Sequence, residues 1–468
     1  MHVFRPGWVS VSLALFLVAA ASSVRAATVS VSGTNVLITL GAGENVSDLN
    51  TSIATNVITV NTVGSANNSL VGTPAGVTVT NNTVVIDTTA FPGFTGFQVL
   101  GGNTTNAVTV GASGILLSAT TANTDSSVVI NLSFNSGTGS LNVNGPITAK
   151  NAGGVTLTSA TLTIVAAGKV TAAAGAVNIT GTAITSAGNV TSGGALNLTG
   201  AITLSGPVSL RALLATVGDI TLVGSINGAQ NLTLEAADTI NVGDIGNTTA
   251  LGTVTITNSA GVSFSSYFIA ANVVATDTTG AISFNGDTDI RTSLTTAAKG
   301  YSLAFGDSSL DATTIAGAPV FRNTGNVAFQ GSTALISGAA IVGGAGTSVV
   351  LANTIVSGGA FNIGAGLSGI TISDGTSLIL NSATAGSTWA SGLSLSGSGT
   401  LNLLGLGALT LSAESSAGVA AGDIINVVNG TLNVTGKLGS SSTTALKNGT
   451  LTGPGGTMGT LSSSSRRF

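Results

Sequence analysis

The residues that could support chemistry in this chain are few, and most are isolated carboxylates. Sixteen Asp and Glu residues are spread over 468 positions. Asp287 and Asp289, in the segment NGDTDIR, are two apart and would share one face of a strand, where carboxylate oxygens can bind Ca²⁺. The alternative interpretation is a polar turn, with Arg291 beside it, that keeps the surface soluble. Asp238 and Asp244 form a second pair, expected about one strand apart.

Other catalytic chemistry lacks the residues it needs. The chain has no Cys and one histidine, His2, in a segment that we expect to be removed. Without histidine there is no Ser-His-Asp arrangement, and a zinc or copper site would need carboxylates alone. The glycine-rich stretch at 343–348 lacks the lysine of a phosphate-binding loop. We therefore predict no catalytic residue, no cofactor-binding residue and no cofactor, with Ca²⁺ at Asp287 and Asp289 as the weak metal candidate.

Aromatic residues make up only 4% of the chain, so single rings stand out. Trp389, in the segment AGSTWASG, is the one tryptophan after position 26, and Tyr267 and Tyr301 are the only tyrosines. An exposed tryptophan can stack on a sugar ring, which makes Trp389 a candidate ligand contact. A ring that plugs a loop or caps one end of the fold explains the same residue equally well.

A seven-residue phrase recurs along the chain and indicates the element that positions these side chains. It reads Gly, small residue, Leu or Val, Asn, aliphatic residue, any residue, Gly. Its apolar and polar positions alternate, which is the period of a strand with one buried face, and its glycines are turn signals. The five copies are GSLNVNG (139–145), GAVNITG (175–181), GALNLTG (194–200), GTLNLLG (399–405) and GTLNVTG (430–436).

The spacing of the repeats predicts a solenoid. The central apolar positions Val155, Val177, Leu196 and Ile220 follow one another at nearly regular, unequal intervals. Each interval fits one turn of a coil with about three short faces, in which every rung pairs with the next at ~4.8 Å. Because crossovers between parallel strands are right-handed in nearly all cases, we predict an all-β, right-handed parallel β-helix with an irregular N-terminal cap.

The regularity of the pattern divides the chain. Residues 27–130 are rich in strands but irregular, and the aromatic stretch FPGFTGF at 91–97 is expected to plug the first rungs of the solenoid. Residues 131–436 form the predicted repeat region. Residues 437–468 thin to Ser, Gly and Thr and are interpreted as a tail.

The segment 1–26 resembles a secretory signal peptide. A weakly basic start is followed by an apolar run from Val9 to about Ala21, and Val24-Arg25-Ala26 places small residues where a signal peptidase cuts. Cleavage after Ala26 would leave ten basic and sixteen acidic residues, a net charge of −6. The run is short for a membrane anchor, and no later segment is a candidate transmembrane span. We expect a secreted or outer-surface protein.

Only 6% of the residues are charged and 66 are glycine. The basic residues that remain after cleavage are dispersed, so no nucleic-acid-binding patch is expected. Outward Thr-x-Thr pairs, as in TVTIT at 253–257, could bind ice, but unequal rungs would break the flat array that such binding needs.

Three parts of the sequence carry a family resemblance: the segment at 75–103, the segment at 246–286 and the GALNLTG-type repeats. They are similar to bacterial beta strand repeat proteins and, more distantly, to filamentous haemagglutinin-like and autotransporter passenger domains. The resemblance covers nearly all of the chain after position 26 and implies a β-helix outside the cell. It implies no catalytic residues. The C-terminal segment lacks the amphipathic strands of an autotransporter barrel.

The function that we expect is therefore structural: a secreted or cell-surface solenoid that acts as an adhesin-like rod, a spacer or a matrix component. Its expected partners are glycans, a host or neighbouring cell surface, or other copies of itself. The alternative is a polysaccharide-acting β-helix enzyme, a lyase or glycoside hydrolase, which would need carboxylates clustered in a groove.

Overall fold

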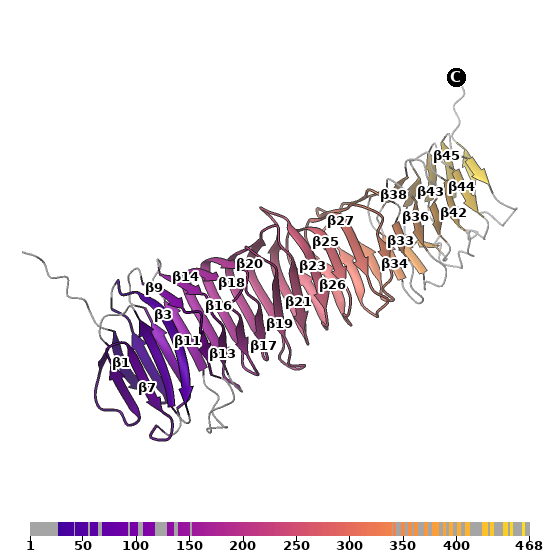
Figure 1. Cartoon of the computed structure of the whole chain (residues 1–468). Coiled ribbons are helices and arrows are strands. Elements are labelled where there is room, and N and C mark those ends of the chain that lie inside the picture. The colour runs from indigo at the N-terminus through magenta and orange to yellow at the C-terminus, as the bar shows by residue number, and fades with distance from the viewer. Residues whose placement is uncertain are drawn as a thin grey trace, which may run out of the picture.

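The protein is an elongated stack of short β-strands, seen in the computed structural model as a rod that runs from β1 to the strands near β45 (Figure 1). The structure describes residues 27–463 with gaps at 42, 55–56, 64–67, 92–93, 102–105, 118–128, 135–138, 150–151, 339, 343–347, 352–353, 358–359, 364–368, 373–376, 383–386, 390–392, 396–399, 404–407, 412–423, 429–430, 435–442, 448–449 and 453–460. All 47 described strands belong to one hydrogen-bonded sheet. The described part of the chain contains no helix, which confirms the predicted all-β solenoid.

The strands form three faces, A, B and C, each a column of parallel strands from successive turns. Face A contains β2 (Asn35–Thr39), β8 (Gly96–Leu100), β11 (Val129–Phe134), β24 (Gly261–Phe264), β26 (Ala281–Phe284), β28 (Ser302–Phe305), β31 (Val327–Phe329), β34 (Ser348–Leu351), β37 (Gly369–Ile372) and β40 (Leu393–Leu395). Five longer strands bend across faces A and B: β14 (Val155–Ile164), β16 (Val177–Ser186), β18 (Leu196–Leu204), β20 (Ile220–Asn227) and β22 (Thr239–Ile245).

The other two faces are built in the same way. Face B contains β3 (Val46–Ala54), β9 (Ala107–Val110), β12 (Ser140–Val143), β29 (Ala312–Ile315), β32 (Thr333–Ile336), β35 (Thr354–Ser357), β38 (Ser377–Ser382), β41 (Thr400–Leu403), β43 (Ile424–Val428), β45 (Thr443–Lys447) and β47 (Leu461–Ser463). Two strands, β25 (Phe268–Ala275) and β27 (Thr288–Thr296), bend across faces B and C.

Face C has the shortest strands. It contains β10 (Ile115–Leu116), β13 (Ile147–Ala149), β15 (Val170–Ala172), β17 (Val190–Ser192), β19 (Val208–Ala212), β21 (Leu232–Ala236), β23 (Leu251–Thr257), β30 (Val320–Phe321), β33 (Ala340–Val342), β36 (Phe361–Ile363), β39 (Ser387–Trp389), β42 (Ala408–Leu411), β44 (Thr431–Val434) and β46 (Thr450–Thr452). Three strands, β45, β46 and β47, extend the stack into 437–468, the segment interpreted from sequence as a tail.

The register of the stack follows the repeat spacing read from the sequence. Val155 pairs with Val177, Val177 with Leu196, and Leu196 with Ile220. All four side chains are fully buried. The unequal intervals between these positions are therefore true coil lengths, and the differences between coils are absorbed at the corners rather than along the faces.

The asparagine of each repeated phrase lies at an outward position on face A, B or C. Asn197 Nδ2 donates to Asn178 Oδ1 of the preceding coil at 2.9 Å, and Asn426 Nδ2 donates to Asn402 Oδ1 at 2.8 Å. Each amide can both donate and accept, so identical residues in register satisfy one another. The polar half of the phrase thus joins coils on the surface while the apolar half joins them in the core.

The first coils are closed by antiparallel pairs. β1 (Thr28–Ser32) pairs with β2, and β7 (Thr83–Asp87) pairs with β4 (Val57–Val63) and β6 (Val77–Thr80), while the short β5 (Ser69–Leu70) lies parallel to β1. β3 and β4 also pair antiparallel. Phe94 and Phe97 of the aromatic stretch are buried at this end of the core. These antiparallel strands cover part of the first rung, while β5 and β6 each pair with one described strand only.

A column of phenylalanines fills the core between β24 and β31. Phe264, Phe284, Phe305 and Phe329 stack in parallel on successive coils, with each neighbouring pair of ring centroids 5.1 Å apart and interplanar angles of 16°, 1° and 12°. Phe268 from face B meets Phe284 edge-on at 4.8 Å, and Phe321 from face C meets Phe329 edge-on at 6.0 Å. Stacked and edge-to-face rings are both favourable aromatic geometries.

Replacing Phe284 with Ala tests this column. Phe284 is 1% exposed and contacts three other rings, so Phe284→Ala should lower the free energy of unfolding by about 3–5 kcal/mol. The control is Ser283→Ala, one residue earlier on the outer side of the same strand. Urea unfolding followed by circular dichroism measures both, and equal shifts in the two variants would contradict a packed aromatic column.

Candidate functional site

A groove lies on the outer surface of the rod, at the corner between face A and face B. It is a hollow of about 400 Å³, lined by residues 221–224, 241–244, 263, 265 and 266. These residues come from β20, β22, β24 and the segment that joins β24 to β25, three successive coils of the stack. The groove therefore runs along the rod axis and spans three rungs.

The groove exists because one corner is shorter than its neighbours. Between the inward residues Leu222 and Ile226, β20 has three residues, and the coil of Phe264 and Phe268 also has three. Between Val242 and Ile245, β22 has only Gly243 and Asp244, and the register shifts by one residue there. The middle corner is drawn inward between two bulkier ones, and Gly243 adds no side chain to fill the space.

Glycines make this corner narrow. Gly181 and Gly200, which end two copies of the repeated phrase, are followed on the next coils by Gly224 and Gly243. Gly200 and Gly224 have φ of +135° and +115°, and a Cβ on Gly224 would collide with the Gly200 carbonyl oxygen. Only glycine adopts such φ values without strain, so the sequence phrase places backbone rather than side chains along this edge.

Several of the residues that line the groove have polar side chains. Asn247 Nδ2 donates to Asp244 Oδ2 at 3.2 Å, and Asp244 Oδ1 takes no hydrogen bond from the described residues. Asn241 is exposed, and its Nδ2 reaches Thr239 Oγ1 at 3.5 Å. Ser263 Oγ accepts from Asn285 Nδ2 at 3.2 Å. These groups retain hydrogen-bonding capacity toward the solvent side.

Exposed apolar surface occurs in the groove and next to it. Val223 is an outward residue of β20, and its side chain is 56% exposed. Tyr267 directly follows the lining residue Ser266 and is 48% exposed, and its carbonyl accepts the Ile245 N–H next to Asp244 at 2.8 Å. A half-exposed tyrosine offers both a ring face and a hydroxyl group.

Asp287 and Asp289, the calcium candidates, both have partners within the protein. Asp287 Oδ1 accepts the Ala312 N–H of the next coil at 2.8 Å. Asp289 Oδ2 is 2.8 Å from Arg291 Nε in a partly exposed ion pair. In the described residues no three Asp, Glu, His or Cys side chains gather as a metal site would require. Calcium binding at this pair stays a prediction.

Asp238 and Asp244 lie near opposite ends of β22, with five residues between them. At ~3.3 Å per strand residue this separation exceeds the ~5–9.5 Å between the carboxyl groups of glycoside hydrolases. The strand therefore holds the two carboxylates apart, and only Asp244 lines the groove.

Trp389 lies in β39, where its backbone pairs with Ile363 and Leu411 of the neighbouring coils. Its side chain lies outside the described residues, so its role as a ligand contact stays a prediction.

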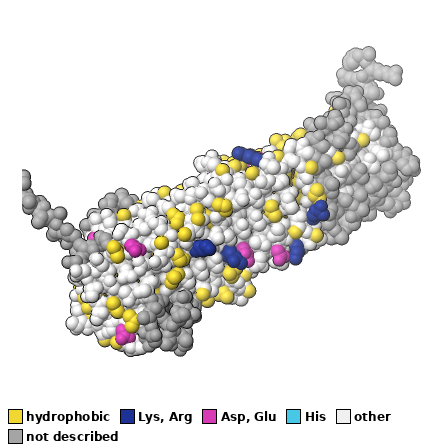
Figure 2. Space-filling model, in the orientation of Figure 1, with side chains coloured by type: hydrophobic (Ala, Val, Ile, Leu, Met, Phe, Trp, Pro, Cys, Tyr) yellow, Lys and Arg dark blue, Asp and Glu magenta, His cyan; other side chains and the backbone are white. Residues whose placement is uncertain are grey.

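Some of the remaining charged groups join coils, and others stabilise their own turn. Arg211 and Glu235 are register partners on face C, with Arg211 Nε 2.7 Å from Glu235 Oε2, and this hydrogen bond and charge raise the pKa of Arg211. Hydrogen bonds from the Thr89 hydroxyl, the Thr89 N–H and the Ala90 N–H lower the pKa of Asp87. On the face seen in Figure 2 charged side chains are few, and some Lys or Arg side chains lie beside Asp or Glu side chains.

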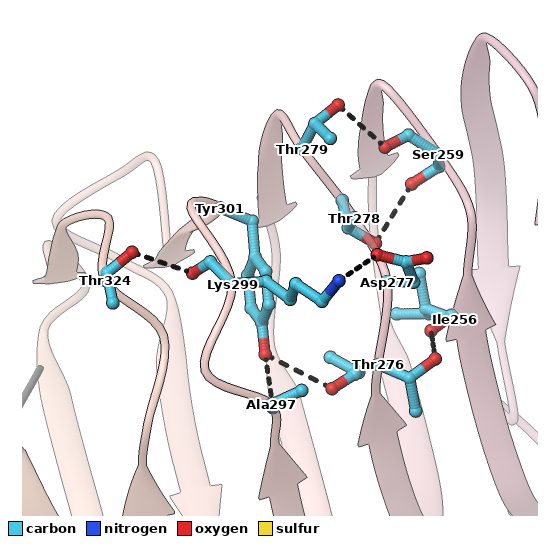
Figure 3. A network of polar contacts seen from close by, with 11 residues as sticks. Ile256, Ser259, Thr276, Asp277, Thr278, Thr279, Ala297, Lys299, Tyr301 and Thr324 are labelled. Carbon is cyan, nitrogen blue, oxygen red and sulfur yellow. Dashed lines mark hydrogen bonds and ion pairs between the residues drawn. The ribbon is translucent and has the colours of Figure 1, made fainter.

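A polar network ties together successive corners between face C and face A (Figure 3). Lys299 Nζ is 3.0 Å from Asp277 Oδ1 on the preceding coil, and Ser259 Oγ lies 3.2 Å from Thr278 Oγ1. Tyr301 is fully buried, accepts the Ala297 N–H at 2.9 Å and donates to the Ala275 carbonyl at 3.2 Å. Burial raises the pKa of the Tyr301 phenol above its ordinary 10.0, although its hydrogen bonds act the other way.

Sequence reasoning missed the groove, although one signal for it was present. The number of residues between inward positions falls from three to two in β22 and returns to three in the next coil. A count of corner lengths after the register is assigned would have located the recess. Tyr267 was noted as one of two tyrosines, but its exposure follows from its place at a corner.

Comparison of the chain with family models, curated proteins and solved structures finds no match. Among the described residues, no helix is long and apolar enough to span a membrane. The function must therefore be argued from the fold and the groove.

The close packing of glycines at this corner can be tested with Gly224→Ala. Because the new Cβ would meet the Gly200 carbonyl and φ is +115°, we expect a loss of about 1–3 kcal/mol in unfolding free energy. Gly300→Ala is the matched control, since nothing lies within 4 Å of its Cβ position. Denaturant midpoints measure both variants, and an unchanged midpoint in Gly224→Ala would be inconsistent with the close corner packing.

The burial of Tyr301 predicts that the protein loses folding stability at alkaline pH. Because burial raises the pKa of the folded phenol, its contribution to stability is complete below about pH 10 and falls as the pH rises above that value toward the folded pKa. Wild type should therefore lose more stability than Tyr301→Phe between about pH 9 and about pH 11. In Tyr267→Phe, Tyr301 is the only tyrosine, so ultraviolet absorbance reports its ionisation; ionisation below pH 10 in the folded protein would refute the assignment.

Proposed function

We propose that this chain is a secreted or cell-surface structural protein that acts as an adhesin-like rod, spacer or matrix component. The observation that carries the proposal is the parallel pairing of the described strands on all three faces, coil after coil, around one apolar core. Over the described residues this stack is continuous, so its coils support one another against bending. A structure of this kind is suited to hold a surface at a distance from its attachment point.

Three further features support a role outside the cell. The N-terminal segment 1–26 has the composition of a signal peptide. The antiparallel strands over the first coils pair part of the strand edge at that end, which limits association through it. The repeats are similar to those of bacterial beta strand repeat proteins, which suggests the same extracellular setting.

The proposal is of a non-catalytic protein. Asp238 and Asp244 are held apart by β22, and Asp287 and Asp289 have partners in their own turn and on the next coil. The groove contributes one carboxylate, whereas glycoside hydrolysis uses two. The polysaccharide-acting enzyme considered from sequence would need a second acidic group there.

Localisation and shape test the proposal together. In cells that make the full chain naturally, we expect it on the outer surface or in the medium, with a mature N-terminus at Ala27. Small-angle scattering should give a stiff rod with one constant cross-section. N-terminal sequencing and antibody labelling of intact cells measure localisation. An uncleaved chain inside the cell, a flexible particle, or polysaccharide turnover in the same preparation would each overturn the proposal.

A further inference from the structure

The groove on face A combines polar and apolar groups in a way that the stack alone does not require. Its lining includes Asp244, Asn241, Ser263, Ser265 and the exposed Val223, and the exposed Tyr267 directly follows the lining residue Ser266. Neither of these two exposed side chains is needed to fill the core. Their place next to hydrogen-bonding groups that still face solvent indicates a ligand.

The donor and acceptor set matches a carbohydrate. A sugar hydroxyl both donates and accepts, and the groove offers an acceptor in Asp244, an amide with both functions in Asn241, and hydroxyls in Ser263 and Ser265. The faces of a pyranose ring carry C–H groups, which pack on an aromatic or aliphatic surface such as Tyr267 or Val223. The volume of about 400 Å³ lies within the usual range for small-ligand sites.

The charge of the lining residues restricts which sugars the groove can bind. The lining residues include one carboxylate and no Lys or Arg. A uronic acid or a sulfated sugar would bring its own negative charge against Asp244 with no cation to compensate. A single carboxylate also falls short of the six to eight oxygens of a calcium site. The groove is therefore suited to an uncharged ring.

We propose that this groove binds neutral saccharides, made of hexose or N-acetylhexosamine units, with Asp244 and Asn241 as the polar anchors and Tyr267 as the ring contact. The inference rests on the proposed function, since it names the partner class of a surface rod. The site is preformed: β20 and β22 are hydrogen-bonded to coils on both sides, so binding orders little backbone.

The test uses the full mature chain on an array of neutral hexose and N-acetylhexosamine oligosaccharides, with uronic acid oligomers alongside. We expect saturable binding to neutral members only. Ser263→Phe fills the groove and should weaken binding at least tenfold, and Asp244→Asn and Tyr267→Ala should each weaken it several-fold. Ser283→Phe is the matched control, because Ser283 is the register partner of Ser263 one coil further on and does not line the groove.

The outcomes distinguish failure of the saccharide site from failure of the rod. No binding to any neutral sugar, a preference for uronic acid oligomers, or equal loss in Ser263→Phe and Ser283→Phe would overturn the saccharide site. Circular dichroism and small-angle scattering on every variant distinguish this from a failure of the rod itself, because a folded rod that binds no sugar leaves the structural role in place. Asp307→Asn, an exposed carboxylate outside the groove, controls for loss of charge.

Discussion

The structure depends on one constraint: each coil must hydrogen-bond to the next in parallel register. Once Val155 is paired with Val177 and Val177 with Leu196, every inward position stands over an inward position and every outward one over an outward one. The chain then needs apolar residues in the core columns and self-satisfying polar residues such as asparagine outside. This explains why a sequence with 6% charge and 4% aromatic residues can form a long ordered core.

The same constraint confines variation to the corners. Along the faces an insertion would turn every following side chain to the wrong side, whereas a corner can gain or lose a residue without altering the pairing on either side. The shortened corner at Gly243 is such a case, and it produces the groove. The network of Tyr301, Lys299 and Asp277 shows a different solution, in which corners are joined by side chains.

The faces could be predicted from sequence and the corners could not. Alternation and the spacing of the repeats identified the inward residues, and the register pairs confirm them. The stacking of the phenylalanines at 264, 268 and 284 depends on the register, so it could not be predicted from the sequence. The groove depends on a one-residue difference between coils, and the antiparallel closure near β1 involves pairings that no repeat encodes.

The central claim is the register itself, and the lack of cysteine in the chain allows a direct test. Asn197 and Thr221 are register partners on successive coils, whereas Val217 is nearer to Asn197 in sequence but out of register with it. Dibromobimane, a short reagent that fluoresces when it joins two thiols, should cross-link Asn197→Cys with Thr221→Cys, whose Cα atoms are ~4.8 Å apart. It should leave Asn197→Cys with Val217→Cys unlinked; preferential linking of the pair nearer in sequence would contradict the stacked solenoid.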